Sequence, residues 1–309
     1  AVGAFSLNAQ NFTTATDSLN TAIGYVAGGA VTTGIRNTIL GGRAGDALTD
    51  ADFNVAIGTD ALTTDTLGSK SVAIGVDALG TQNFTTATNS YNTAVGDSAG
   101  LRVTTGVQNT LLGGLAGDAL TDADNNIAIG YGALSNDTLG STSIGIGVLA
   151  LAEQNFTTAT NTYNIAIGFR AGEKVSTGIQ NTIVGGLAGD ALTDADFNVA
   201  IGMQALSADT LGSTSTAVGV AALASQNFTT ATQSLNTALG YYAGVNVTTG
   251  IKNVLIGAQA GDAITTGSNN VIVGVDSAAA AVNNDNIIVL GQAVTSTGSG
   301  NFTFGFSTT

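Results

Sequence analysis

A 72-residue period runs through the chain and limits the folds open to it more than any other feature. The heptapeptide QNFTTAT occurs at residues 10–16, 82–88, 154–160 and 226–232, and each copy starts 72 residues after the previous one. The octapeptide GDALTDAD keeps the same period at residues 45–52, 117–124 and 189–196. Self-similarity at a fixed period is typical of repeat architectures, in which stacked copies of one unit bury a shared core.

Each 72-residue repeat is divided by a short apolar run that ends in glycine. These glycines recur at steps of 17, 17, 17 and 21 residues until a final step of 14, and their eighteen positions indicate about eighteen coils. The four extra residues always fall in the coil that contains QNFTTAT. We expect repeat coils over residues 1–291 and a terminal coil over residues 292–309. Because the chain begins in the middle of a motif, we also expect it to be a segment of something longer.

The residues before each glycine predict short parallel strands. They are β-branched, small and aliphatic in turn, whereas the segments between them are rich in Thr, Ser, Asn and Gly and lack helical periodicity. A coil of 17 residues has room for two short strands and two turns. The sequence therefore predicts an all-β fold, a parallel β-solenoid (β-roll) with about 4.8 Å between coils.

Identical residues should lie above one another in such a stack. The position four before the glycine is Asn or Ser in almost every coil, and we expect an amide ladder in which each side chain bonds to its neighbours. The glycine column supplies backbone angles that residues with a Cβ avoid. The ladder residues of the first coils are Asn20, Asn37, Asn54, Asn92, Asn109 and Asn126, with Gly24, Gly41, Gly58 and Gly75.

Both faces of the strand before each glycine are apolar. The β-branched and aliphatic positions share one face, and the small position lies on the other. Parallel strands with two apolar faces are usually covered on both sides, and a 17-residue coil encloses only a thin core. We therefore expect the second face to pack against another copy of the chain, and a coaxial homotrimer is the simplest closed arrangement. A monomer stays open, because many β-branched positions are Thr.

Composition argues against several partners and chemistries. The 309 residues include no Pro, Cys, His or Trp, and only 9% are charged. A net charge of −14 with seven Lys and Arg offers no basic stripe, so we expect no nucleic acid partner. No apolar run reaches the ~18 residues of a membrane span, so we expect no membrane insertion. Because acid–base and nucleophilic catalysis usually rely on His or Cys, we expect that the protein is not an enzyme.

Several runs resemble a known kind of fibrous repeat. NTAIGYVAG (20–28), NVAIGTDAL (54–62), SVAIGVDAL (71–79) and NTAVGDSAG (92–100) look like the head repeats of trimeric autotransporter adhesins and the repeat rods of bacteriophage tail fibres. In the adhesin heads each coil is a turn of a left-handed parallel β-roll, and three chains pack side by side. The coils of this chain are longer than those of the adhesins, which makes it look more like a phage or other extracellular fibre. Residues 286–309 resemble the fading repeats near the end of such fibres.

The repeat and the resemblance together predict a structural role. We expect a rod of an extracellular fibre, on a cell or virion surface, that gives reach and attaches to a host or surface, with cell-surface glycan as a possible partner. The alternative is a subunit of a self-assembling bacterial extracellular filament, with chains joined end to end. Ice binding is disfavoured, because the Thr columns are interrupted by Val and Ile. We expect no cofactor.

Two motifs have a functional and a structural interpretation. The cluster Asp46, Asp50, Asp52 recurs at residues 118, 122, 124 and at residues 190, 194, 196. Oxygen-rich loops of this type can bind calcium, but the spacing lacks the Gly and Glu of an EF-hand, and a solvated acidic turn is favoured. GGRAGD (41–46) suggests a phosphate loop, yet no Lys-Ser or Lys-Thr follows it, which favours a glycine-rich turn.

Two further features are candidates for surface recognition. QNFTTAT carries an Asn-x-Thr sequon at Asn11, Asn83, Asn155 and Asn227, and we expect a surface ridge there that is either a spacer loop or a receptor contact. Aromatic residues that follow the glycines could stack on the apolar faces of sugars or take part in trimer contacts. They are Tyr25, Tyr131, Phe169, Tyr241 and Tyr242.

Overall fold

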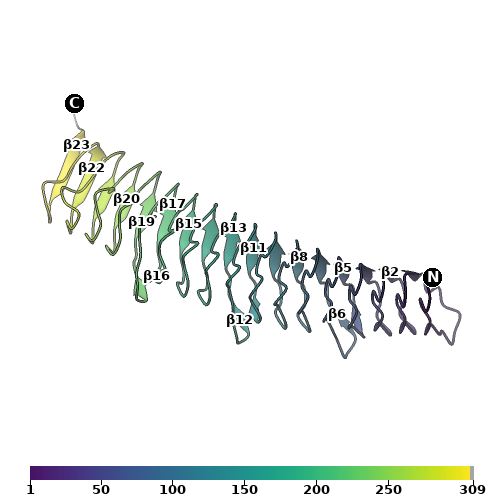
Figure 1. Cartoon of the computed structure of the whole chain (residues 1–309). Coiled ribbons are helices and arrows are strands. Elements are labelled where there is room, and N and C mark those ends of the chain that lie inside the picture. Colours follow the sequence, from purple (N-terminus) through teal and green to yellow (C-terminus); the bar gives the residue numbers. More distant parts are fainter. Residues whose placement is uncertain (307–309) are drawn as a thin grey trace. The chain divides into compact units, whose positions relative to one another are not determined.

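The computed structural model describes residues 1–306, in which only strands, bridges, turns and bends occur. Residues 1–162 form one compact unit, and a second unit begins at residue 163. In each unit successive coils stack and pair their strands in parallel, which confirms the predicted all-β parallel solenoid (Figure 1). The predicted terminal coil over residues 292–309 includes residues 307–309, which lie outside the described residues.

The main sheet of the first unit has eight strands of three residues each. Each strand pairs in register with the next, so that Ala22 lies beside Ile39 and Ile39 beside Ala56. An isolated bridge at Val2 takes the place of a strand in the coil before β1. The strands are β1 (Thr21–Ile23), β2 (Thr38–Leu40), β3 (Val55–Ile57), β5 (Val72–Ile74), β7 (Thr93–Val95), β8 (Thr110–Leu112), β9 (Ile127–Ile129) and β11 (Ile144–Ile146).

The main sheet of the second unit has nine strands and the same parallel register. Its last two strands are five residues long and pair with each other over all five residues. The strands are β13 (Ile165–Ile167), β14 (Thr182–Val184), β15 (Val199–Ile201), β17 (Thr216–Val218), β19 (Thr237–Leu239), β20 (Val254–Ile256), β21 (Val271–Val273), β22 (Ile288–Gln292) and β23 (Phe302–Phe306).

A second strand forms only next to the long coils. Two-residue parallel pairs join the 21-residue coil to the coil before it, and the other 17-residue coils have one strand each, although 17 residues have room for two. Turns replace the second strand because several positions per coil adopt left-handed backbone angles, as at Arg43 and Phe53. The pairs are β4 (Gly68–Ser69) with β6 (Thr88–Asn89), β10 (Gly140–Ser141) with β12 (Thr160–Asn161), and β16 (Gly212–Ser213) with β18 (Thr232–Gln233).

The glycine that ends each strand occupies a position where no side chain fits. Gly41 has a φ of 143°, and a Cβ on it would meet the carbonyl oxygen of Gly58 in the next coil. The same holds along the column, where the Cβ of one glycine would meet the next glycine's backbone. The coils can therefore stack at strand spacing only if this position carries no side chain.

The core is thin, and large side chains on the strands face small residues in the turns, and the reverse. The middle residue of each three-residue strand and the alanines three after the glycine, such as Ala44, are fully buried. In two coils of each repeat the residue four after the strand-ending glycine is itself glycine, and the pair accommodates one large strand residue, since a Cβ on Gly28 or Gly45 would contact the Ile39 side chain. In the other two coils the strand residue is small and a leucine, as at Leu62, fills that turn. Each buried leucine contributes about 2 kcal/mol.

Candidate functional surface

The middle residue of each three-residue strand points inward, so the β-branched and aliphatic residues on either side of it point away from the core. Thr21, Thr38, Val55 and Val72 form one outward column of the first unit, and the residues two positions later form the other. We call the two columns of a unit its outer face. The aliphatic column of the first unit consists of Ile23, Leu40, Ile57, Ile74, Val95, Leu112, Ile129 and Ile146.

The aliphatic column of the outer face is apolar and open to solvent, and the other column mixes Thr with Val and Ile, as at Thr38 and Val55. The Leu40 and Leu112 side chains are 43% and 46% exposed, and most of their neighbours in the column are half-buried. The second unit has the same arrangement, with Ile167, Ile201 and Leu239 exposed and Phe302 and Phe304 continuing the two columns on β23. Monomeric proteins rarely expose a continuous apolar patch of this kind, so the outer face is the main candidate interaction surface of each unit.

The predicted asparagine ladder exists, but it bonds mainly to backbone. The Asn54 Oδ1 accepts a hydrogen bond from the Ser71 backbone N at 2.8 Å, and its Nδ2 donates to the Gly68 carbonyl at 2.9 Å. Asn37 and Asn126 make the same two kinds of bond, and direct amide–amide bonds such as Asn109 to Asn92 are the exception. The ladder therefore satisfies buried turn groups rather than forming a self-contained amide stack.

A buried polar network lies beside each of the two-stranded pairs β4–β6, β10–β12 and β16–β18. It was not predicted from the sequence. The Asp65 carboxylate accepts hydrogen bonds from the backbone N of Gly68 and Phe84 and from the Gln82 Nε2 at 2.6 Å. Gln82 also donates to the Ser71 hydroxyl and accepts from the Asn92 Nδ2 at 2.8 Å. Equivalent carboxylate–glutamine bonds join Asp137 to Gln154 and Asp209 to Gln226. The sequence DTLGS, which recurs before the last three copies of QNFTTAT, was the available signal.

Burial of this carboxylate shifts its ionisation. Loss of hydration raises the pKa of Asp65, and the hydrogen bonds from Gln82, Phe84 and Gly68 oppose the shift. Burial also raises the pKa of Asp118 and Asp190. The Oδ1 atoms of these two residues are buried and have no hydrogen-bond partner among residues 1–306, whereas the equivalent Asp46 accepts a bond from the Thr63 hydroxyl at 2.6 Å.

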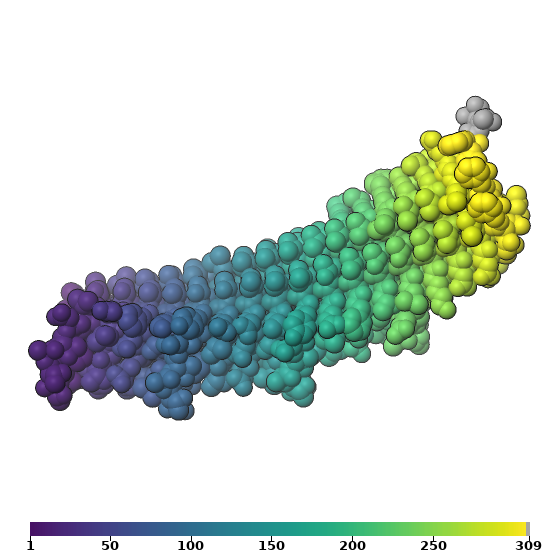
Figure 2. All heavy atoms as spheres, turned by 180° about the vertical axis from the view of Figure 1, so that it is seen from behind, coloured from purple at the N-terminus to yellow at the C-terminus, as the bar shows by residue number. Residues whose placement is uncertain are grey.

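The QNFTTAT segment is only partly a surface ridge. Gln82 and Phe84 are buried, and the ridge consists of the Thr85–Ala87 part that follows them. These loops project beyond the neighbouring coils near β6, β12 and β16 (Figure 1) and stand out from the surface (Figure 2). The sequon residue Asn83 accepts a hydrogen bond from Thr66 at 3.1 Å, and Asn155 and Asn227 accept equivalent bonds from Thr138 and Thr210.

The three aspartates considered for calcium are directed at different partners. Asp46 accepts from Thr63, Asp50 from the Thr33 hydroxyl at 2.6 Å and Asp52 from the Ile35 backbone N at 2.8 Å. Across residues 1–306 no three His, Cys, Asp or Glu side chains are grouped so that they could hold a metal ion. The hydrogen bonds of these three aspartates join neighbouring coils.

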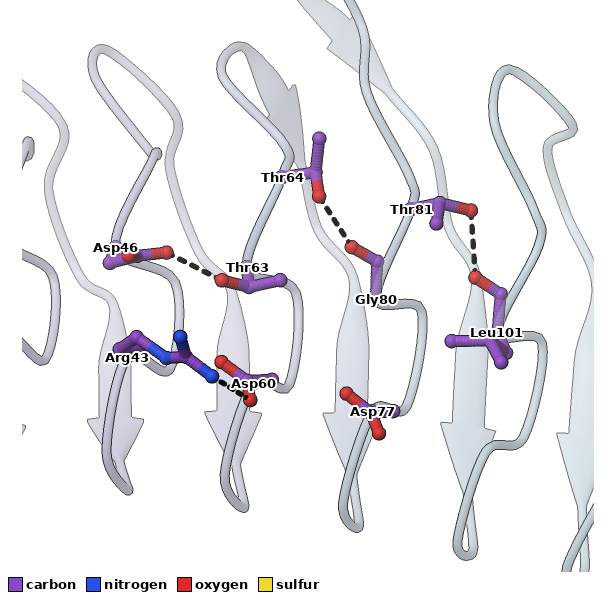
Figure 3. A pocket seen from close by; sticks show the side chains of 9 residues that line it. All are labelled: Arg43, Asp46, Asp60, Thr63, Thr64, Asp77, Gly80, Thr81 and Leu101. Atoms are coloured by element: carbon purple, nitrogen blue, oxygen red, sulfur yellow. Dashed lines mark hydrogen bonds and ion pairs between the residues drawn. The ribbon is translucent and has the colours of Figure 1, made fainter.

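Asp46 also lines a groove of about 360 Å³ on the first unit. Figure 3 shows the Arg43 guanidinium paired with Asp60 of the next coil, with Asp77 one coil further on. The Asp60 hydrogen bond and charge raise the pKa of Arg43, which is already a permanent cation. Because Arg43 is exposed, the pair contributes little to stability.

The aromatic residues considered for recognition are exposed but distributed. In the first unit Tyr25 packs edge-on against Phe5, while Tyr131 lies six coils away along the stack. In the second unit the rings of Tyr241 and Tyr242 are in contact, with centroids 4.3 Å apart, and Phe169 lies four coils away. Within each unit these residues are thus separate surface rings, apart from the Tyr241–Tyr242 pair.

Comparison of the chain with protein-family models, with curated proteins and with solved structures found no match. No helix within residues 1–306 has the length and apolar character that crossing a membrane requires.

Proposed function

We propose that the chain is a structural segment of an extracellular fibre, of the phage tail-fibre or adhesin-like kind, in which three copies associate through their outer faces. The observation that carries the proposal is the continuous aliphatic column on the outer face of a parallel sheet whose other face is already buried. Parallel sheets are nearly always covered on both sides, and in each unit the coils leave the outer columns uncovered.

The geometry of the outer face suits an identical partner. Its columns repeat at the spacing of paired strands, about 4.8 Å, so equivalent surfaces on two copies can match along the stack. A closed ring of three copies would hide this face from water and leave the ridge loops available. The resemblance of the repeats to trimeric adhesin heads and tail fibres supports the same arrangement, a role outside the cell or on a virion, and a spacer rather than a catalyst.

A charge placed on the outer face should separate the copies. We expect Leu40→Lys with Leu112→Lys to convert a trimer into monomers, because burying two uncompensated ammonium groups per chain costs several kcal/mol. Native mass spectrometry and sedimentation would measure the change, and circular dichroism would verify that the β-solenoid is intact.

Val76→Lys is the matched control. Val76 is 46% exposed, as Leu112 is, but it follows the glycine turn and lies outside the two columns. The control variant should stay trimeric. A wild-type chain that is folded and uniformly monomeric would overturn the proposal, and an open series of masses would favour the self-assembling filament instead.

A further inference from the structure

A second groove lies beside the ridge loop of the second unit. It has a volume of about 300 Å³ and collects residues from three successive coils. One wall is Asp196 and Phe197, just before β15, and the other follows β16 and β18. Its lining residues are Asp196, Phe197, Ser213, Thr214, Ala231, Thr232 and Gln233.

The Phe197 ring is presented to solvent. Its side chain is 52% exposed, and no other ring or cation packs against it within residues 1–306. The backbone at Phe197 is left-handed, with a φ of 60°, as it is at the equivalent position of the other coils. The ring is thus held outward by the fold and adds nothing to the core, which leaves one broad apolar surface in an otherwise polar groove.

Polar groups surround this ring and are partly pre-positioned. The Asp196 Oδ1 accepts a hydrogen bond from the Ile179 backbone N at 2.8 Å, and the Asp196 backbone N donates to the Ser213 Oγ at 3.0 Å. These bonds fix the carboxylate while its Oδ2 makes no hydrogen bond with the described residues. The exposed Gln233 amide, likewise without a hydrogen bond to them, lies across the groove.

The equivalent positions of the first unit differ from the Phe197 groove in the residues that line them. In one repeat Phe53 occupies the Phe197 position, but the Arg36 guanidinium lies 5.3 Å from its ring centroid and Lys70 replaces Thr214. In the other repeat Asn125 replaces the phenylalanine, and Asn161 replaces Gln233. Asp52 and Asp124 occupy the position of Asp196 in the two repeats of the first unit, and both accept a backbone hydrogen bond as Asp196 does.

We propose that the groove around Phe197 binds a neutral sugar, with the C–H face of one pyranose ring stacked on Phe197. Asp196 Oδ2 would accept hydrogen bonds from sugar hydroxyls, and Gln233 and Thr232 can both donate and accept. The groove has a carboxylate and no cation among its lining residues, which disfavours anionic sugars. A cationic ligand would gain from more than one ring, and Phe197 is the only aromatic lining residue. This site does not depend on self-association and goes beyond the proposed fibre role.

The first test is binding to immobilised oligosaccharides of glucose, galactose, mannose and N-acetylglucosamine, with sialylated glycans and a choline-coated surface for comparison. The folded chain should bind at least one neutral glycan, and Phe197→Asn should weaken that binding about tenfold. Phe53→Asn is the matched control and should change nothing. Binding only to charged probes, no binding, or equal binding by the Phe197→Asn variant would overturn the proposal.

A gain of function makes the second test. Asn125→Phe combined with Asn161→Gln copies the lining of the Phe197 groove into the first unit, where Thr142 and Ser141 already match Thr214 and Ser213. Titration calorimetry with the best neutral glycan should then give twice the stoichiometry per chain. The fold should tolerate the exchange, because Asn125 and Phe197 have the same left-handed φ. An unchanged stoichiometry in a folded variant would count against the site.

Discussion

At the residue scale the solenoid depends on positions where any side chain is excluded. Gly41 and Gly42 are adjacent and differ in this respect. A Cβ on Gly41 would meet the Gly58 carbonyl oxygen, and its φ of 143° is unfavourable for any L residue, whereas a Cβ on Gly42 meets no heavy atom within 4 Å. One is part of the strand-ending column, and the other is a surface turn residue.

Alanine at these two positions should therefore have opposite consequences. We expect Gly41→Ala to lower the free energy of unfolding by about 3 kcal/mol, because the backbone must move or the coils must separate. Gly42→Ala should change it by less than about 0.5 kcal/mol. Urea unfolding followed by circular dichroism would measure both, and equal effects would contradict this account of the glycine column.

At the scale of the element, the 21-residue coil differs from the other coils in the polar side chains that it buries. Two coils of each repeat bury a valine or leucine at this position, as at Leu48, whereas the two coils around the ridge bury an aspartate and a glutamine, as at Asp65 and Gln82. A buried carboxylate is unfavourable unless its oxygens are hydrogen-bonded, and here two backbone N–H groups and a side-chain amide supply the partners. The same backbone N–H groups would be unsatisfied without the carboxylate, so the network specifies where the chain may lengthen its coil.

The raised pKa of Asp65 predicts a pH dependence. Because the folded state holds this proton more tightly than the unfolded state, the penalty for ionising Asp65 is absent below its ordinary pKa and fully present above its raised pKa. Stability from this residue is therefore lost as pH rises. Urea midpoints of the wild type and Asp65→Asn between pH 4 and 8 should diverge in favour of the variant as pH increases. A difference that does not change with pH would refute the assignment.

At the scale of the whole molecule, the repeat makes each unit tolerant of some deletions and not of others. Each coil bonds to the coils before and after it, as expected for a solenoid whose stability is a sum of neighbour terms. Removing a complete coil keeps every column in register. The stability of the shortened chain then depends on whether the side chains of the two newly adjacent coils fit one another.

Two deletions of equal length test this. Removing residues 25–41 joins Gly24 to Gly42 and leaves the Asp65–Gln82 network untouched, so the chain should fold with a modest loss of stability. Removing residues 59–75 joins Gly58 to Val76 and places Leu48 where Asp65 had faced Gln82. Because Gln82 then loses its carboxylate, we expect a further cost of about 2 kcal/mol. Comparable thermal stability of the two variants would show that the network is dispensable.

The sequence alone determined the architecture, because a solenoid places identical residues above one another and the columns can be read directly from the period. The steps of 17 and 21 residues, the glycine column and the parallel pairing of the triplets could all be predicted in this way. The resemblance to adhesin heads and tail fibres, and the trimer that it implies, remain predictions.

Only the tertiary structure decided which face of each strand is inside. Both faces are apolar, and the period of two cannot rank them. The structure buries Ala56 completely and leaves Val55 and Ile57 half-buried on the outer face. The pairing of Asp65 with Gln82, and of Phe197 with Gln233 across one groove, was likewise hidden. These residues lie 17 and 36 positions apart. They meet because stacked turns bring them together. Residues with left-handed backbone angles set where each side chain points around the coil, and composition does not reveal which residues these are.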